Sequence, residues 1–337
     1  MIARPDLPPT TGARWWRREG EAARCQLCPH ACLLSPGETG CCRVRVHVHG
    51  TGLVTENYGM ASSMAVDPVE KKPLYHWKPG TEILSIGSVG CNMNCPFCQN
   101  WSLAERSPSV TLTRIDPRDP ARIASERKIP SVAFTYNEPV VWLEFILDAC
   151  PHLAEERIPV VLISNGMINP SPLKELLPRL AAANIDLKAF NREAYRFMGG
   201  DLETVKRSIM ALVEFGVHVE TTFLLVPGIN DDPGEFERMT EWLSSLDPIP
   251  VLHISRYFPN RRWREPPTSL ALLEEFERIA RYRLPWVYRG NTDGESNTIC
   301  SSCGAALVRR RRLAAIEINL DDEGRCSRCH HPSPIVL

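Results

Sequence analysis

The sequence carries almost no net charge and has no long apolar run. Lys and Arg number 39 against 40 Asp and Glu in 337 residues, a formal net charge of -1. No overall field therefore favours nucleic acid, a membrane surface or an acidic partner. No run of roughly 18 apolar residues occurs, which argues against a membrane-spanning helix. The first residues lack a basic region followed by an apolar segment, so we expect a soluble, cytoplasmic protein.

The composition predicts one large core with small appendages, because 43% of the residues are hydrophobic and 23% are charged. Thiols in a reducing compartment stay reduced, so we interpret the 13 cysteines as metal ligands rather than disulfides. Cys150 lies on an apolar segment and is expected to be an inert buried thiol. The others form three groups: Cys25, Cys28 and Cys32 with Cys41 or Cys42; Cys91, Cys95 and Cys98; Cys300, Cys303, Cys326 and Cys329.

Short β-branched or apolar runs alternate with helix-like stretches in the middle of the chain. The runs predict six strands, at 82–90, 131–136, 158–165, 183–189, 217–226 and 250–257. Repeated strand-helix units imply parallel strands covered by helices, and six strands favour an incomplete barrel over an open sheet. Chemistry in such folds gathers at the carboxyl ends of the strands.

The loop "GCNMNCPFCQNW" (90–101) follows the first of these strands. Three thiolates on one tight loop can bind three irons of a cubane cluster and leave the fourth iron open for chemistry. Zinc is the alternative metal, but it would need a fourth ligand, and only asparagine is nearby. A further alternative is a strand-to-helix loop with incidental cysteines.

The Cys91-x3-Cys95-x2-Cys98 spacing, with the aromatic Phe97 before the third cysteine, resembles the signature of the radical S-adenosylmethionine (radical SAM) superfamily. The resemblance implies a partial (βα)6 barrel of the TIM type and a 4Fe-4S cluster whose open iron binds SAM. It also implies an oxidoreductase activity, in which one electron cleaves SAM to methionine and a 5'-deoxyadenosyl radical that abstracts hydrogen from a substrate.

Further segments resemble AmmeMemoRadiSam-system radical SAM enzymes, relatives of the pyruvate formate-lyase activating enzymes. These are "CQLCPHAC", "DPVEKKPLYHWKPG" (67–80), "TYNEP" (135–139), "IDLKAF" (185–190), "LVPGIND" (225–231), "HISRYFP" (253–259), "CSSCG" and "CSRC". The resemblance implies a one-electron donor such as a flavodoxin or ferredoxin. It suggests a protein glycine as target, or work alongside Memo-like and AMMECR-like proteins, and does not choose between them.

The resemblance also implies SAM contacts. Asn137 and Glu138 take the place of residues that hold the SAM amino group, although Glu138 is also suited to start a helix at Pro139. Ser164 and Asn165 are candidates for the ribose or the methionine carboxylate, with a simple turn as the alternative.

Four more positions concern the same pocket. Asp186 and Lys188 are two apart on a strand and should face the barrel interior, where Lys188 suits the SAM carboxylate. His253 suits the adenine or the substrate, with a hydrogen-bonded core histidine as the alternative. Phe97 is expected to pack on the adenine face. No residue is assigned a catalytic role.

One position departs from the activating enzymes. They carry an arginine that contacts SAM shortly before the "VPG" segment, whereas this chain has Glu220, Thr221 and Thr222 there. That contact therefore does not carry over, and the substrate side of the pocket is expected to differ.

The last cysteine group has the pattern of a four-thiolate zinc ribbon, with the segment between the two pairs forming a hairpin. A closed tetrahedral zinc site would stabilise a segment too small for its own core. The run Arg309 to Arg312 is expected to be a solvated face rather than a nucleic-acid surface.

The first cysteine group predicts a second site of Cys25, Cys28, Cys32 and Cys42, with His30 or Cys41 as substitutes. The family pattern selects Cys42, two residues after Gly40. Zinc and an auxiliary iron-sulfur cluster both fit, and we favour zinc.

Three regions follow: an N-terminal cysteine-rich module at 1–60, a radical SAM partial barrel at 61–285 and a zinc-ribbon-like module at 286–337. The expected activity is radical hydrogen abstraction from an unidentified substrate. The alternatives are an iron-sulfur redox sensor and a zinc-ribbon binding protein without catalysis.

Overall fold

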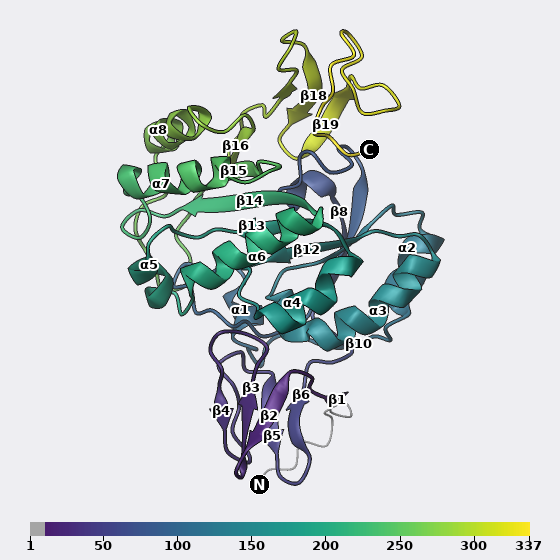
Figure 1. The fold of residues 1–337 in the computed structure, drawn as a ribbon, viewed down its shortest axis with the longest axis vertical. Coiled ribbons are helices and arrows are strands. Elements are labelled where there is room, and N and C mark those ends of the chain that lie inside the picture. The colour runs from purple at the N-terminus through teal and green to yellow at the C-terminus, as the bar shows by residue number, and fades with distance from the viewer. Residues whose placement is uncertain (1–10) are drawn as a thin grey trace.

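The computed structural model describes residues 11–337, and its centre is an eight-stranded sheet (Figure 1). The strand order is β16-β15-β14-β13-β12-β11-β9-β8; all neighbouring pairs are parallel except β8 and β9. The strands are β8 (Ser63–Pro68), β9 (Glu82–Gly87), β11 (Val132–Phe134), β12 (Val160–Ser164), β13 (Leu180–Asp186), β14 (His218–Leu225), β15 (Val251–Arg256) and β16 (Val287–Gly290). The expected α/β partial barrel is confirmed.

All six strands predicted from the sequence are present, and two further strands extend the sheet. β8 escapes a search for apolar runs because most of its side chains are not buried, and β16 is only four residues long. Because β16 pairs with β15, the sheet continues past residue 285, where the sequence placed the end of the barrel.

Helices join successive parallel strands and cover the sheet (Figure 1). They are α1 (Trp101–Ala104), α2 (Asp119–Glu126), α3 (Leu143–Glu155), α4 (Pro170–Leu176), α5 (Arg192–Phe197), α6 (Leu202–Phe215), α7 (Pro233–Ser244) and α8 (Leu270–Arg281), with 3-10 turns η1 (Val69–Lys71), η2 (Pro139–Trp142) and η3 (Leu177–Arg179). The sequence encodes clear boundaries: Asp201 caps α6 by accepting the Thr204 N–H at 2.8 Å, and Gly216 ends it with a φ of +87°. None of the helices in residues 11–337 is long and apolar enough to cross a membrane.

The segment 69–77 closes the barrel at the amino ends of the strands. Leu74 and Trp77 pack there with apolar residues of the inner sheet face, among them Ile83 and Ala133. This apolar floor leaves the carboxyl ends of the strands as the open end of the barrel.

The last residues of the chain are tied to the same segment. The Val336 N–H donates to the carbonyl of His76 at 2.8 Å, and its own carbonyl accepts the Lys78 N–H at 2.7 Å. The base of the barrel is therefore held by the C-terminal end of the chain.

The two small modules lie at opposite ends of the molecule (Figure 1). The N-terminal one contains β1 (Thr11–Gly12), β2 (Trp16–Glu19), β3 (Ala22–Cys25), β4 (Leu33–Leu34), β5 (Arg45–Val48) and β6 (Gly52–Thr55); β7 (Met60–Ala61) pairs with β10 (Thr113–Arg114). The C-terminal one contains β17 (Thr298–Ile299) and the expected hairpin of β18 (Ala306–Arg311) and β19 (Ala314–Ile318). The first ten residues of the expected 1–60 module lie outside the described residues.

Candidate active site

Three thiols share the loop at the carboxyl end of β9. Cys95 is buried, Cys91 and Cys98 are half-buried, and none is in a disulfide. The loop starts at Gly90, which has a φ of +92° and where a Cβ atom would come within 2.7 Å of the Cys42 carbonyl oxygen. Only glycine meets both demands. The N-terminal module therefore packs directly on the start of the loop.

Two of the expected site residues hold this loop in place. Asn137 donates from Nδ2 to the Gly90 carbonyl at 3.0 Å. Asn165 donates to Asn92 Oδ1 at 2.9 Å, and its Nδ2 lies 3.8 Å from Cys91 Sγ. Residues that follow β11 and β12 thus meet the thiol loop that follows β9.

Glu138 is buried and hydrogen-bonded from three directions. Its Oε1 accepts the Val140 N–H at 2.9 Å and the Ser164 hydroxyl at 2.7 Å, and its Oε2 accepts the Asn165 N–H at 2.8 Å. It therefore caps η2, which is the structural role that the sequence left open. Burial raises the pKa of Glu138 to about 7, despite these hydrogen bonds. A carboxylate has about four acceptor sites, so one remains for a ligand.

Asp186 and Lys188 lie together at the end of β13, as their spacing predicts. Lys188 Nζ contacts Asp186 Oδ2 at 2.7 Å, so the lysine has a partner within the protein. Burial would lower the Lys188 pKa, but the charges of Asp186 and Cys95 outweigh it and raise the pKa. Burial raises the pKa of the Cys95 thiol to about 11, although the Lys188 charge opposes this. A cation is thus placed beside the thiol loop.

A cavity of about 1090 Å³ opens beside these groups. One side is formed by expected site residues: Asn137, Glu138, Ser164, Asn165, Asp186 and His253. The other side comes from the segment 70–75, from β15 and β16, from residues 291–296 and from the β18–β19 turn. The cavity is therefore larger than the expected SAM site and reaches the C-terminal module.

Glu220 is buried below the cavity and organises the segment that lines it. Its two oxygens accept the Tyr75 N–H at 3.0 Å, the His76 N–H at 2.7 Å, His218 Nε2 at 3.1 Å and His253 Nε2 at 2.6 Å. Burial alone would raise the pKa of Glu220, but the hydrogen bonds from the two histidines hold it well below its usual range. A carboxylate only accepts hydrogen bonds, so both imidazoles donate to it from Nε2.

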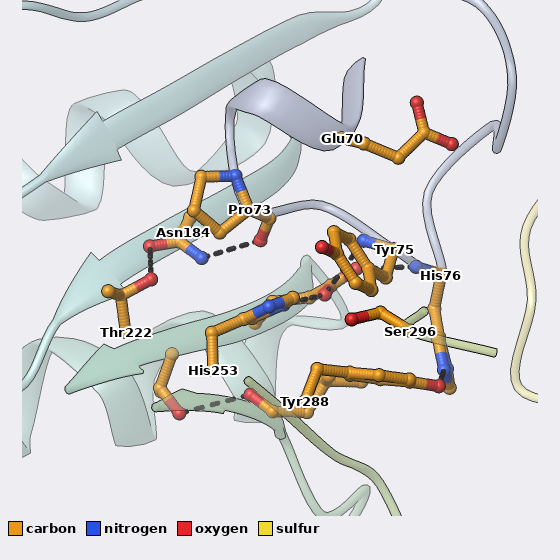
Figure 2. A network of polar contacts seen from close by, with 12 residues as sticks. Glu70, Pro73, Tyr75, His76, Asn184, Thr222, His253, Tyr288 and Ser296 are labelled. Carbon is orange, nitrogen blue, oxygen red and sulfur yellow. Dashed lines mark hydrogen bonds and ion pairs between the residues drawn. The ribbon is translucent and has the colours of Figure 1, made fainter. Parts of the chain in front are cut away.

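His253 lies within β15 and has contacts that match both interpretations of it. Its ring is 4.7 Å from the Tyr75 ring and 5.6 Å from the Tyr288 ring, and it lines the cavity (Figure 2). Because Nε2 donates to Glu220, neutral His253 carries an acceptor lone pair on Nδ1. It is a hydrogen-bonded core histidine that also borders the ligand space.

Phe97 is buried at the thiol loop. It is 4% exposed and belongs to the main hydrophobic core, and it is absent from the cavity lining. The aromatic position before the third cysteine therefore anchors the loop in the core, and its packing on the adenine face stays a prediction.

The four C-terminal cysteines form a compact cluster. Their sulfur atoms all lie within 4.8 Å of one another, and the Cys300–Cys329 and Cys303–Cys326 pairs are each 3.7 Å apart. A tetrahedron with zinc-sulfur bonds of about 2.3 Å has edges of about 3.8 Å. The four thiols therefore fit a closed tetrahedral metal site.

The N-terminal thiols are arranged less regularly. Cys32 Sγ lies 3.7 Å from Cys41 Sγ. A hydrogen bond from Cys41 lowers the pKa of Cys28 to about 7 and that of Cys32 to about 5. Cys42, which the family pattern selects, is buried, and burial raises its pKa to about 11. The structure thus groups Cys41 with Cys28 and Cys32.

Two other candidates for the N-terminal site have neighbours of their own. His30 Nε2 is 2.7 Å from the carbonyl of Asn92, in the thiol loop. Cys25 is buried, with its sulfur 4.0 Å from Arg45 Nη1. The histidine therefore links the module to the thiol loop through that nitrogen.

Several groups at this site have no role in the sequence-based prediction. Tyr75 and Lys72 lie in the quoted segment 67–80, and Lys72 Nζ lies 4.4 Å above the Tyr136 ring. Arg310 was assigned to a solvated face but is fully buried. The alternation of a strand could have indicated that one arginine of the run faces inward.

Comparison with known proteins gives three relevant similarities. The family described as "Radical SAM superfamily" matches residues 85–243. An uncharacterized protein of Methanocaldococcus jannaschii is 35% identical over 322 residues, covering 93% of this chain and 96% of that protein. The pyruvate formate-lyase-activating enzyme of Staphylococcus epidermidis is 23% identical over 190 residues, covering 53% of this chain and 75% of that enzyme.

A solved structure is similar in fold. A radical SAM methyltransferase from Sphaerobacter thermophilus matches with a TM-score of 0.50 and 16% identity, covering 64% of this chain and 68% of that one. The family match spans β9, the thiol loop and the strands that bring Asn137, Glu138 and Asp186 to it. With its fold, its three-thiol loop and these similarities, the chain belongs to the radical SAM superfamily.

Proposed function

We propose that this protein cleaves SAM reductively and uses the resulting 5'-deoxyadenosyl radical to abstract hydrogen from a substrate bound in the same cavity. The observation that carries the proposal is the position of the three-thiol loop beside the large cavity at the carboxyl ends of the strands. Asn137 and Asn165 hold the loop and also line the cavity. Gln99 and Asn100, which directly follow Cys98, line it as well. The superfamily makes the chain a radical SAM enzyme. The hydrogen-abstraction step and the oxidoreductase class are our proposal.

The donor set of the loop fits a 4Fe-4S cluster. Three free cysteines lie on one loop, and soft thiolates are the usual ligands of such clusters. Burial raises the thiol pKa values, so the thiols must lose their protons as metal binds. When bound, the cluster supplies one electron to SAM, which yields methionine and the 5'-deoxyadenosyl radical.

The chain's own residues supply the remaining contacts. Glu138 keeps an acceptor site toward the cavity, which suits the ammonium of SAM. Lys188 lies beside Cys95 and Asp186, where its charge suits the SAM carboxylate. Asn165 orients Cys91 through its amide nitrogen.

Both cysteine modules are proposed to hold zinc. The 3.7 Å sulfur-sulfur distances support zinc at Cys300, Cys303, Cys326 and Cys329. At the N-terminal site, the Cys32–Cys41 distance of 3.7 Å supports zinc with Cys41 among its ligands. An auxiliary iron-sulfur cluster is the alternative there.

The substrate and partners are proposed from similarity alone. The partly similar activating enzyme suggests a protein glycine as target. An AmmeMemoRadiSam-type enzyme would instead work with Memo-like or AMMECR-like proteins. Either would need a one-electron donor such as a flavodoxin or ferredoxin.

The test is anaerobic reconstitution with iron and sulfide, followed by metal analysis and an assay for 5'-deoxyadenosine with SAM and dithionite. Deoxyadenosine that depends on both cluster and reductant is the expected result, with Cys95→Ala as the inactive control. A cluster that assembles without binding or cleaving SAM would overturn the proposal and favour an iron-sulfur redox sensor. Metal totals of two zinc ions beside four irons would support the assignment of the modules.

A further inference from the structure

One arginine of the C-terminal hairpin points toward the segment that closes the barrel. In the run Arg309 to Arg312, the Arg309 and Arg312 side chains are 53% and 77% exposed, whereas that of Arg310 is 0% exposed. Successive side chains of a strand face opposite sides, so Arg310 alone of the first three faces inward. A buried guanidinium needs specific partners.

Those partners lie in the segment that lines the cavity. Arg310 Nη2 donates to the Tyr75 carbonyl, and its guanidinium carbon lies 4.5 Å from the centre of the Tyr75 ring. Arg310 Nε is 3.6 Å from Glu70 Oε1, and both carboxyl and guanidinium are fully buried. Tyr75 and Glu70 themselves line the cavity (Figure 2). Arg310 therefore supports the cavity wall from behind.

Arg310 is also joined to the cysteine cluster by short stretches of chain. Its strand β18 begins three residues after Cys303. Its Nη1 donates to Thr298 Oγ1 at 2.8 Å, two residues before Cys300. Both attachments of Arg310 thus run from the same pair of cysteines, Cys300 and Cys303.

The same hairpin reaches the cavity itself. Arg312 and Leu313, at the β18–β19 turn, are among its lining residues, together with Asp293 and Ser296 from the preceding connection. The module therefore borders the part of the cavity away from the thiol loop.

We propose that the C-terminal cysteine module forms the substrate-side wall of the cavity, with Arg310 as the positioning residue through which the bound metal holds residues 70–75. This inference depends on the proposed radical SAM function only in assuming that the cavity binds a substrate. The structural coupling of metal site, Arg310 and segment 70–75 stands apart from the radical chemistry.

Hydrogen exchange on the full-length, zinc-loaded protein tests this coupling. The Tyr75 and His76 amides donate to buried Glu220 and are expected to exchange slowly. Arg310→Gln is expected to speed their exchange at least tenfold, while the zinc content and the exchange of β12 stay unchanged. Cys329→Ser, which removes one proposed metal ligand, is expected to have the same effect on residues 70–80.

Two variants separate positioning from simple packing. Arg309→Gln changes an exposed arginine of the same strand and is expected to leave residues 70–80 as slow as in the wild type. Arg310→Lys keeps a charge that can reach the Tyr75 carbonyl, so it is expected to recover part of the lost protection. Equal loss with Lys and Gln would contradict a role through charge and hydrogen bonding.

The hydrogen-exchange results can contradict this coupling independently of the radical SAM function. Faster exchange confined to residues 298–337 would make the module an independent appendage and overturn the proposal, as would a uniform increase through the barrel. If Arg310→Gln does not fold, Arg310→Lys and Cys329→Ser decide. Deoxyadenosine formation by the wild type, measured in parallel, tests the radical function without bearing on the exchange result.

Discussion

Replacing Glu220 with glutamine tests the polar network below the cavity. The carboxylate accepts four N–H groups, two from the backbone and two from imidazoles. A glutamine has one side-chain oxygen, so its NH2 group would face the two donors that the second carboxylate oxygen accepts in the wild type. Two buried donors without acceptors cost about 1–3 kcal/mol each, which gives a loss of about 2–6 kcal/mol in the free energy of unfolding.

The pH dependence of the same variant checks the charge. The pKa of Glu220 is held below its usual range, so its ionised form stabilises the folded state above the unfolded pKa of about 4.3. This stabilisation is lost as the pH falls through the lower, folded pKa. The advantage of the wild type over Glu220→Gln is therefore expected to be full at neutral pH and to shrink in acid.

Urea unfolding followed by tryptophan fluorescence and circular dichroism measures both effects. The control is Glu241→Gln on α7, because Glu241 is exposed. A loss below about 0.5 kcal/mol for Glu220→Gln, equal to an ordinary surface substitution, would refute the reasoning. A difference that stays constant down to pH 3 would refute the assignment of a charged carboxylate.

Three other predictions concern the thiol loop, the core and the metal sites. Gly90→Ala places a Cβ atom 2.7 Å from a backbone oxygen of the N-terminal module and is expected to lower iron incorporation severalfold. The control is Gly37→Ala, which has a similar φ of +88° and open space around it and is expected to keep the wild-type iron content. Equal iron contents in the two variants would contradict the packing argument. Phe276→Ala removes a fully buried ring that lies 4.6 Å from another phenylalanine ring. It is expected to lower the free energy of unfolding in urea by about 3–5 kcal/mol. A decrease of less than about 1 kcal/mol would be inconsistent with a packed core there. Cys95→Ala is expected to abolish cluster binding and deoxyadenosine formation, whereas Cys329→Ala is expected to release one zinc and lower the melting temperature; retained cleavage in the first variant would sink the cluster assignment.

The sequence predicted the parts of the fold that depend on local pattern. The six central strands are apolar runs, and most residues expected at the site end or directly follow strands whose carboxyl ends meet. β16 could not be found in this way, because four residues paired to a single neighbouring strand carry little periodic signal.

The remaining parts depend on contacts between distant segments. Glu220 looked like a departure from a family contact, and its partners Tyr75 and His76 lie about 145 positions earlier in the chain. Arg310 was expected to be solvated because it is one of four consecutive arginines, which the local sequence does not distinguish. Neither role is visible until the barrel has closed and the C-terminal module has packed against it.

The attachment of the chain's last residues to segment 76–78 bears on the order in which the protein is built. During synthesis the barrel strands leave the ribosome well before Arg310 and Val336, although Tyr75 and His76 need both. Tyr75 and Arg310 are 235 positions apart, a separation that makes their contact slow to form. Until these contacts form, the side of segment 75–78 that Arg310 and Val336 cover is exposed on the nascent chain.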